Sequence, residues 1–280
     1  MFLTLWKDIL SLLHTYGINY LEGMVNTLIL ATLATFFGCL IGFACGVLNT
    51  IPHPRTDPLP KRILLAIIRG IIRIYVEVFR GTPMILQAVF IYYGLPYFTH
   101  NALQFSNPWG VSICVVSINT GAYIAESVRG GIISVDPGQT EGARALGMNH
   151  FQTMVHVILP QALRNLLPQI GNNFIINIKD TSVMFIISFS EFFAVHRMIS
   201  GAIFTYFPSA TIEMAGYLTM TLTASFLLRK LEKVVDGDDN YELKDVSESE
   251  RDYELMNDDQ LVMAAGNYTY PDPQKGGKRG

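Results

Sequence analysis

The chain has 280 residues, of which 50% are hydrophobic and only 15% are Asp, Glu, Lys or Arg, whereas about a quarter of the residues in soluble domains are charged. Its formal net charge is −3 and its mean hydropathy is +0.32. Residues 23–54 and 81–125 contain no charged side chain. Because about 20 apolar residues cross a bilayer as a helix, the composition argues against a soluble enzyme, a disordered chain and a disulfide-rich scaffold. It predicts an all-α integral membrane protein.

Residues 1–21 carry apolar side chains at helical spacing, which predicts a short interfacial helix at the membrane surface. A frayed terminus is the alternative. The segment does not resemble a signal peptide, because no positive charge precedes its first apolar stretch and Lys7–Asp8 interrupts that stretch.

A transmembrane domain is predicted over residues 22–232, with five spans. These lie at about 24–48, 75–95, 109–133, 166–187 and 211–228. The first span has a glycine every fourth residue, at Gly38, Gly42 and Gly46, and small residues at this spacing let two helices pack closely in lipid. Gly81-Thr82-Pro83 should kink the second span, because proline removes a backbone hydrogen bond.

The segments between and after the spans are also patterned. The proline-rich residues 51–60 predict a loop. In a loop over 136–160, Asp136-Pro137 and Gly147 predict the start and end of a helix over 137–146. Asn149 and Gln152 resemble a capping box for a second short helix, which Pro160 should interrupt. A further helix is expected over 190–207, outside the core.

Basic residues near the span ends predict the orientation, because cytoplasmic loops are enriched in Lys and Arg. Eight lie on one side: Arg55, Lys61, Arg62, Arg144, Arg164, Arg229, Lys230 and Lys233. Only Lys7 and Arg197 lie on the other. This places the N-terminus outside, the C-terminus in the cytoplasm and the 136–160 loop in the cytoplasm.

The C-terminal part differs from the rest in charge. Residues 1–233 carry 15 basic and 11 acidic side chains, whereas residues 234–280 carry 5 and 12. Residues 233–280 are polar and poor in branched aliphatics, so we expect an acidic, mostly disordered cytoplasmic tail. No clustered basic face indicates nucleic-acid binding.

The most specific motif is Glu141-Gly-Ala-Arg-Ala-Leu-Gly147, followed by Val157-Ile-Leu-Pro160. It resembles the EAA loop of the permease subunits of ABC importers, with Gly142 in place of the first alanine. Four strings further resemble the polar amino acid branch of these permeases, and with their surroundings they cover roughly residues 20–232. They are Tyr75–Pro83, Gly121–Glu126, Val157–Arg164 and Lys179–Ser182.

The resemblance implies a fold, partners and a site. It implies a permease of the type I ABC importer kind in a bacterial inner membrane, importing a polar amino acid. The coupling residues would be Glu141, Gly142, Ala143, Ala145, Leu146 and Gly147. The implied partners are two copies of an ATP-binding subunit, a second permease that is identical or homologous, and an extracytoplasmic amino acid-binding protein, with membrane lipid around them.

The chain is not expected to be an enzyme. It has no Gly-x-x-x-x-Gly-Lys-Ser/Thr phosphate loop, so ATP hydrolysis is assigned to a partner. No catalytic residue, metal site or cofactor is predicted, because the six histidines are scattered and Cys39, Cys45 and Cys114 match no metal spacing.

Two polar stripes are candidates for the substrate path. Asn119, Tyr123 and Glu126 share one face of the third span. Asn173, Asn177 and Asp180 share a face of the fourth span with Gln169, and such a stripe in lipid is expensive unless it faces protein or water. A carboxylate and amides suit an amino acid zwitterion. Alternatively, Glu126 pairs with Arg129 and Glu77 with Arg80 as packing ion pairs.

Two other function classes stay open. An ion-coupled secondary transporter or a channel would also have polar spans, although such transporters are often built from inverted repeats and the sequence shows none. A membrane enzyme is less favoured, because no His-Glu-x-x-His is present.

Overall fold

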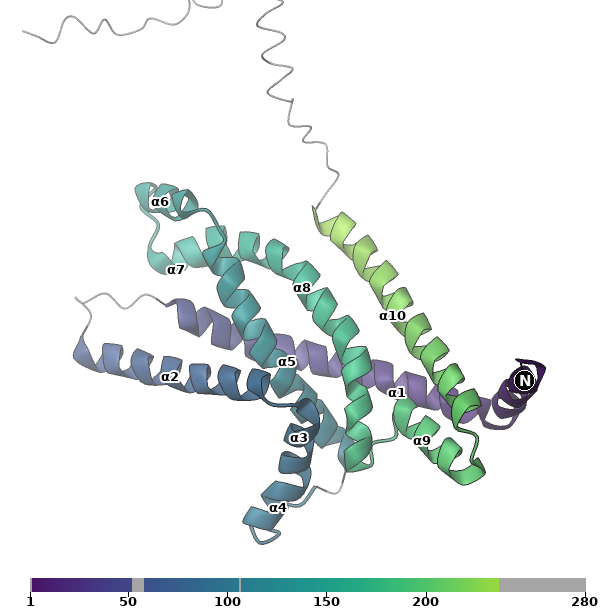
Figure 1. The fold of residues 1–280 in the computed structure, drawn as a ribbon. Helices are drawn as coiled ribbons and strands as arrows, with labels where there is room; N and C mark the ends of the chain where they lie inside the picture. The colour runs from purple at the N-terminus through teal and green to yellow at the C-terminus, as the bar shows by residue number, and fades with distance from the viewer. Residues whose placement is uncertain (1, 52–57, 106, 237–280) are drawn as a thin grey trace, which may run out of the picture. The chain divides into compact units, whose positions relative to one another are not determined.

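The structure, a computed structural model, describes residues 2–51, 58–105 and 107–236, and within these ranges all regular structure is helical. Figure 1 shows the order of the helices along the chain. Most of the predicted loop over 51–60 and nearly all of the predicted tail lie outside the described residues, so the prediction of disorder stays a prediction.

The first helix, α1 (Phe2–Thr50), packs along α5 (Pro108–Ile133) through the three glycines predicted to allow close packing. A Cβ atom added at Gly42 would lie 2.5 Å from Cβ of Ile124, and one at Gly46 would lie 2.5 Å from Cβ of Val128. At Gly38 the corresponding distance to Cβ of Thr120 is 2.7 Å. We call Gly38, Gly42 and Gly46 the glycine seam, and its expected role in helix packing is confirmed.

α1 runs without interruption through residue 22, so no helix break separates the predicted interfacial segment from the predicted first span. Leu12 and Tyr20 are buried in a cluster with residues of α9 and α10, including Phe192 and Met220. The N-terminal segment is therefore continuous with the first long helix and packed against the protein.

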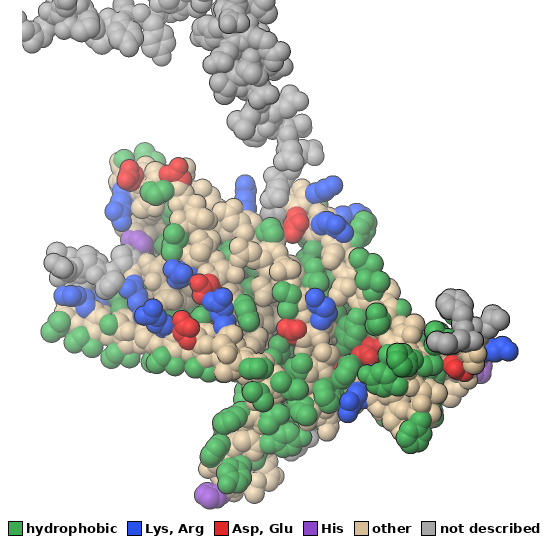
Figure 2. All heavy atoms as spheres, viewed as in Figure 1, with side chains coloured by type: hydrophobic (Ala, Val, Ile, Leu, Met, Phe, Trp, Pro, Cys, Tyr) green, Lys and Arg blue, Asp and Glu red, His purple; other side chains and the backbone are tan. Residues whose placement is uncertain are grey.

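The second predicted span is divided between two helices. α2 (Leu59–Gly81) ends at the predicted kink, where Thr82 is extended, and Pro83 begins α3 (Met84–Val89). A π-helical turn (Phe90–Gly94) then leads into α4 (Leu95–Phe98). Figure 2 shows a row of hydrophobic side chains along one edge of α2 and basic side chains along the other; exposed members of the apolar row include Ile63, Ile67, Ile71 and Ile74.

The predicted short helices of the 136–160 loop are present. α6 (Pro137–Ala145) begins where Asp136 accepts a hydrogen bond from the amide of Gly138, at 2.7 Å. α7 (His150–Thr153) has the predicted capping box, in which the side chains of Asn149 and Gln152 each bond the other residue's amide.

The prediction that Pro160 interrupts the second short helix is wrong. α7 continues through a π-helical turn (Met154–Ile158) directly into α8 (Leu159–Asp180). Pro160 lies in the first turn of α8, where the widened turn before it accommodates the missing amide. The predicted span over 166–187 therefore joins the end of α8 to a 3₁₀ segment (Thr181–Ile187), which ends at Ser188 with φ of 61°.

The last two helices are α9 (Phe192–Ile203) and α10 (Tyr206–Asp236). In Figure 1, α9 and the start of α10 lie at the opposite end of α8 from α6 and α7. The hydroxyl of Tyr20 lies 2.6 Å from Oγ of Ser209, and Nδ1 of His196 lies 2.8 Å from the same atom. These contacts join α1, α9 and α10.

By length and apolar composition, two of the described helical segments can cross a membrane, Thr4–Thr50 and Pro108–Ile133. A third crossing is possible if His150–Ile187 and Phe192–Ile203, which are bent by 51°, count as one span. α2 is not among these candidate spans, because its 23 residues include six charged side chains. The all-helical membrane fold is thus supported, whereas the count of five spans stays a prediction.

Candidate functional site

The six predicted coupling residues form the exposed end of a capped projection. Glu141, Gly142, Ala145, Leu146 and Gly147 are exposed, and Ala143 is the buried residue that anchors α6. Beneath it, Val135, Ile158 and Ala162 form a small apolar cluster. Glu141 forms no ion pair among the described residues, so its carboxylate is available to a partner.

The end of α6 is fixed by its backbone. Gly147 has φ of 80°, the left-handed conformation that favours glycine. Its amide donates to the carbonyl of Arg144 at 2.9 Å, and the amide of Met148 donates to that of Ala143 at 3.1 Å. This is a Schellman motif. It presents the side chain of Leu146, 84% exposed, at the tip of the projection.

A side-chain contact connects the projection to the long helix behind it. Nε2 of Gln161, in the first turn of α8, donates to Oε1 of Gln139 in α6, at 3.3 Å. α8 also continues α7, so α6 and α7 are both connected to α8.

Two of the predicted substrate-path residues are held by neighbouring helices. Asn119 is buried, and its amide donates to the carbonyl of Phe79 at 3.0 Å and to Oε1 of Gln87 at 3.1 Å. It therefore braces the break between α2 and α3. Asn177 is also buried; its amide donates to Oγ1 of Thr35 at 2.8 Å, and its side chain bonds Thr120.

Tyr123 and Glu126 face outward with Arg80. The guanidinium of Arg80 contacts Oε2 of Glu126 at 2.5 Å and lies 5.3 Å from the ring centre of Tyr123. Arg129 reaches Oε1 of Glu126 at 3.3 Å, so the alternative pairing of Glu126 with Arg129 is present. The suggested partner of Arg80 was Glu77, whereas the structure pairs Arg80 with Glu126.

Asn173 and Asp180 complete the predicted stripe on α8. The amide of Asn173 donates to the carbonyl of Gln169 in its own helix, at 2.9 Å. Asp180 is half-buried at the last residue of α8. Asn177 reaches α5 through Thr120, which lies outside the predicted stripe of Asn119, Tyr123 and Glu126. The contacts of that stripe to other helices go to α2 and α3 instead.

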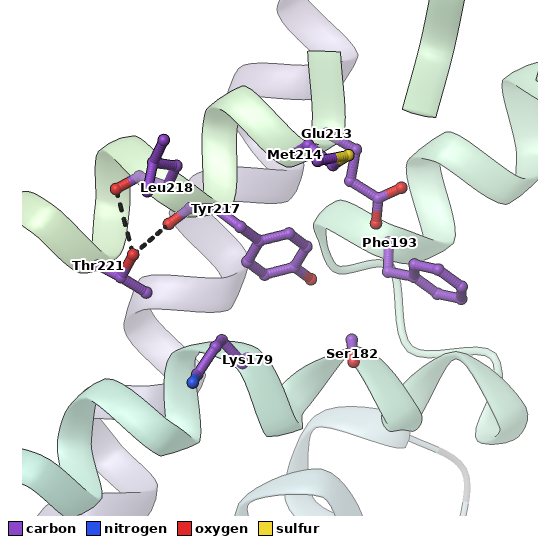
Figure 3. A pocket seen from close by; sticks show the side chains of 8 residues that line it. All are labelled: Lys179, Ser182, Phe193, Glu213, Met214, Tyr217, Leu218 and Thr221. Atoms are coloured by element: carbon purple, nitrogen blue, oxygen red, sulfur yellow. Dashed lines mark hydrogen bonds between the residues drawn. The ribbon is translucent and has the colours of Figure 1, made fainter. Parts of the chain in front are cut away.

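The sequence interpretation missed a pocket between the end of α8, α9 and α10. Figure 3 shows the side chains from these elements that line it. It is an open hollow with a volume of about 510 Å³, lined by Lys179, Ser182, Phe193, Glu213, Met214, Tyr217, Leu218 and Thr221. The sequence contained one indication of this pocket. Glu213 is an ionisable residue inside a predicted span, and such residues are usually functional.

Two carboxylates lie near this pocket in contrasting surroundings. Glu191, fully buried, caps α9 and accepts from the amides of Phe193 and Ala194, at 2.7 and 2.6 Å. It also accepts from the hydroxyl of Tyr217 at 3.0 Å. Glu213 is 7% exposed, and its contact is Nε2 of His196 at 3.6 Å.

Comparison with known proteins gives a consistent result. Residues 63–236 match the family model described as "Binding-protein-dependent transport system inner membrane component". The chain is 35% identical to the glutamine transport system permease protein GlnP of Escherichia coli (strain K12) over 213 residues, which are 76% of this chain and 91% of GlnP. It is 30% identical to the probable amino-acid permease protein YxeN of Bacillus subtilis (strain 168), over 82% of this chain and 95% of YxeN.

Solved structures of ABC transporters also contain chains that resemble this chain in fold. A chain from the "Crystal structure of an amino acid ABC transporter with histidines" is 34% identical, with a TM-score of 0.69 over 80% of this chain and 97% of the other. A chain of the MetNI methionine ABC transporter in an inward-facing conformation has a TM-score of 0.64 at 19% identity, covering 79% of this chain and 98% of the other, which is a likeness of fold.

Proposed function

The chain belongs to the family of binding-protein-dependent transport system inner membrane components, and from this premise we propose that it carries a polar amino acid into the cell. It is a multi-pass inner membrane permease of an ABC transporter, and such permeases are not themselves enzymes. The polar amino acid is the proposal, supported by the 35% identity to a glutamine permease.

The observation that carries the mechanism is the capped projection at α6. Its buried Ala143 and its Schellman end hold Glu141 and Leu146 in a fixed, exposed arrangement. A carboxylate and an apolar side chain on a thin helix suit a groove on an ATP-binding subunit that has a basic residue at its rim. Movement of that subunit is then transmitted through Gln139 and Gln161 to α8.

The proposed arrangement in the membrane has five spans. α2 and α3 together make the second, and α10 makes the fifth. The N-terminus with its interfacial segment, residues 1–21, lies outside, whereas the projection and the acidic tail, residues 233–280, lie in the cytoplasm. Two ATP-binding subunits, a second permease and an extracytoplasmic binding protein complete the complex.

The predicted path residues take two roles in this proposal. Asn119 and Asn177 position helices, because their amides are used in buried hydrogen bonds. Tyr123 and Glu126 face the passing amino acid, with Arg80 beside them. Asn173 and Asp180 lie along α8, toward the outer end of the same path.

The test is transport by the complete complex in proteoliposomes. With the ATP-binding subunit, the binding protein and ATP inside the vesicles, labelled glutamine or another polar amino acid should accumulate. A variant ATP-binding subunit that cannot hydrolyse ATP is the control. Accumulation that follows an imposed ion gradient without ATP would instead support a secondary transporter.

A further inference from the structure

The break between α2 and α3, where Figure 1 shows the chain turning sharply, is held by side-chain hydrogen bonds. Thr82 is extended, so the last carbonyls of α2 cannot be met by a further turn of the same helix. The hydroxyl of Thr82 donates to the carbonyl of Val78 at 2.7 Å. The carbonyl of Phe79 accepts from the side-chain amides of Gln87 in α3, at 2.9 Å, and Asn119 in α5, at 3.0 Å.

Gln87 is the residue that joins all three helices at this break. It is 7% exposed, and its Nε2 lies 2.9 Å from the carbonyl oxygen of Phe79 and 3.0 Å from both the carbonyl oxygen and Oγ1 of Thr82. Its Oε1 accepts from the amide of Asn119 at 3.1 Å. Because a carbonyl oxygen can only accept, the end of α2 needs these amide donors, and a buried acceptor that loses its donor is costly.

The residue directly after Phe79 is Arg80. Its guanidinium contacts Oε2 of Glu126 at 2.5 Å and lies 5.3 Å from the ring centre of Tyr123. The side chains of this ion pair are 40% and 43% exposed, and an ion pair so exposed contributes little to holding a backbone in place. The position of Arg80 therefore depends on the last turn of α2, which Gln87 fixes.

The rest of α2 is attached to α5 independently of Gln87. The hydroxyl of Tyr75 donates to the carbonyl of Ile118 at 2.6 Å, one turn before the break. Leu65 and Ile72 of α2 are buried as well. Loss of the Gln87 amide should therefore loosen the end of α2 while the helix stays on α5.

We propose that Gln87 is a positioning residue of the permease, which fixes the last turn of α2 so that Arg80 stays against Glu126 and Tyr123. The inference rests on the proposed function, in which these three side chains lie along the path of the amino acid. Gln87 is buried and its amide is engaged at both ends, so it acts through Arg80 and does not itself contact the passing molecule.

The first test measures transport by the complete complex in proteoliposomes, with binding protein, ATP and labelled L-glutamine. Gln87→Met keeps the length of the side chain and removes its donors. The maximal rate per assembled complex should fall at least fivefold, because a supporting contact sets the geometry of the group that it holds. The apparent KM for liganded binding protein should stay within twofold. Gln104→Met makes the same change at an exposed position before α5 and should transport normally.

The second test reports the position of residue 80 directly. In Arg80→Lys, a carbodiimide should join the introduced amine to the carboxylate of Glu126, and mass spectrometry of the linked peptides measures the product. Linkage to Glu77, three residues earlier in α2, requires no contact with α5 and serves as the internal control. Adding Gln87→Met should lower the ratio of the Glu126 product to the Glu77 product at least threefold, whereas adding Gln104→Met should leave it unchanged.

The outcomes separate this proposal from the proposed function. An unchanged ratio of products overturns the positioning role, whatever happens to transport. A changed ratio with transport by assembled Gln87→Met within twofold of the natural rate also overturns the proposal, and the proposed function stands. If the natural complex accumulates no amino acid with ATP, the proposed function fails and the role of Gln87 in transport fails with it.

A milder variant covers a failure of Gln87→Met to assemble, which co-purification of the ATP-binding subunit would reveal. Thr82→Val removes one acceptor of Gln87 and the hydroxyl that bonds Val78, at an exposed position. Transport and the ratio of products should each fall at least twofold. If neither falls, the proposal is wrong.

Discussion

The contact between α1 and α5 and the attachment of α10 are built in different ways. At the glycine seam the two backbones approach so closely that a single added Cβ at Gly42 would lie 2.5 Å from Cβ of Ile124. α10 combines an apolar contact, in which Met220 and Ala224 are buried with Phe192, with buried hydrogen bonds through Ser209 with Tyr20 and His196 and through Tyr217 with Glu191. Close packing in lipid makes a contact that has one arrangement, and the contact of α10 adds buried polar groups that need their partners. The contact between α1 and α5 therefore depends mainly on shape, whereas the attachment of α10 depends on shape and on paired polar groups.

The glycine seam should give the largest effect on folding. Gly42→Val adds a branched side chain where no space exists, and overpacking costs about 1–3 kcal/mol or more. We expect little folded protein, measured as the monodisperse fraction after detergent extraction. Gly17→Val in the same helix is the control, because a Cβ at Gly17 meets nothing within 4 Å. Equal yields from both variants would contradict the rigid contact.

The projection at α6 should be sensitive in function and insensitive in folding. Glu141→Lys places a positive charge against the expected basic partner, and Gly147→Val puts a β-branched residue at φ of 80°. ATP-driven uptake should fall at least tenfold while the amount of inserted protein persists. Gly201→Ala in α9, away from the projection, is the control, since a Cβ at Gly201 meets nothing within 4 Å. Normal uptake by both variants would remove the coupling assignment.

The attachment of α10 should tolerate a loss that the seam does not. Ser209→Ala leaves the hydroxyl of Tyr20 and the imidazole of His196 without their shared partner, at a cost of about 1–2 kcal/mol. The expected result is a lower melting temperature with a folded product. Ser225→Ala, also in α10, should change the melting temperature less, because its hydroxyl donates to the carbonyl of Thr221 in the same helix. Complete loss of folded Ser209→Ala protein would contradict this expectation, because it would show that the hydrogen bonds of Ser209 are as essential for folding as the glycine seam.

The pair of arginines at Glu126 should give the smallest effect on stability. The side chains of Arg80, Glu126 and Arg129 are 40%, 43% and 47% exposed, and such ion pairs contribute about 0–1 kcal/mol. Glu126→Gln should therefore insert and assemble normally, as judged by the yield of complex. Uptake by the assembled variant then decides whether Glu126 contacts the substrate; transport at the natural rate would remove it from the path.

Local signals predicted the parts of the structure that depend on neighbours in the sequence. Asp136 and Gly147 mark the ends of α6, Asn149 and Gln152 form the predicted capping box, and α5 has nearly the predicted bounds. The spacing of the glycines predicted a close contact, although it could not name α5 as the partner. These features follow from backbone hydrogen bonding within one or two turns.

Other features could not be predicted from sequence patterns, because they depend on which helices contact each other. A lone Pro160 indicates a break, yet a π-helical turn before it keeps the helix continuous. Asn119 and Asn177 look like path residues until their partners on other helices are known. The pocket at Glu213 joins residues from α8 and α10 that lie more than 30 positions apart in the sequence, and no short motif contains them.

The helix is unbroken from His150 to Asp180, and it therefore connects the 136–160 loop rigidly to the opposite end of α8. At a rise of about 1.5 Å per residue it reaches roughly 45 Å, from the short helices of the 136–160 loop to the start of the 3₁₀ segment. A rigid helix transmits rotation as well as translation, so in the proposed mechanism a small twist at α7 also turns the residues at the far end of α8. Within this run, the π-helical turn at Met154–Ile158 is the place where the helical hydrogen-bonding pattern changes.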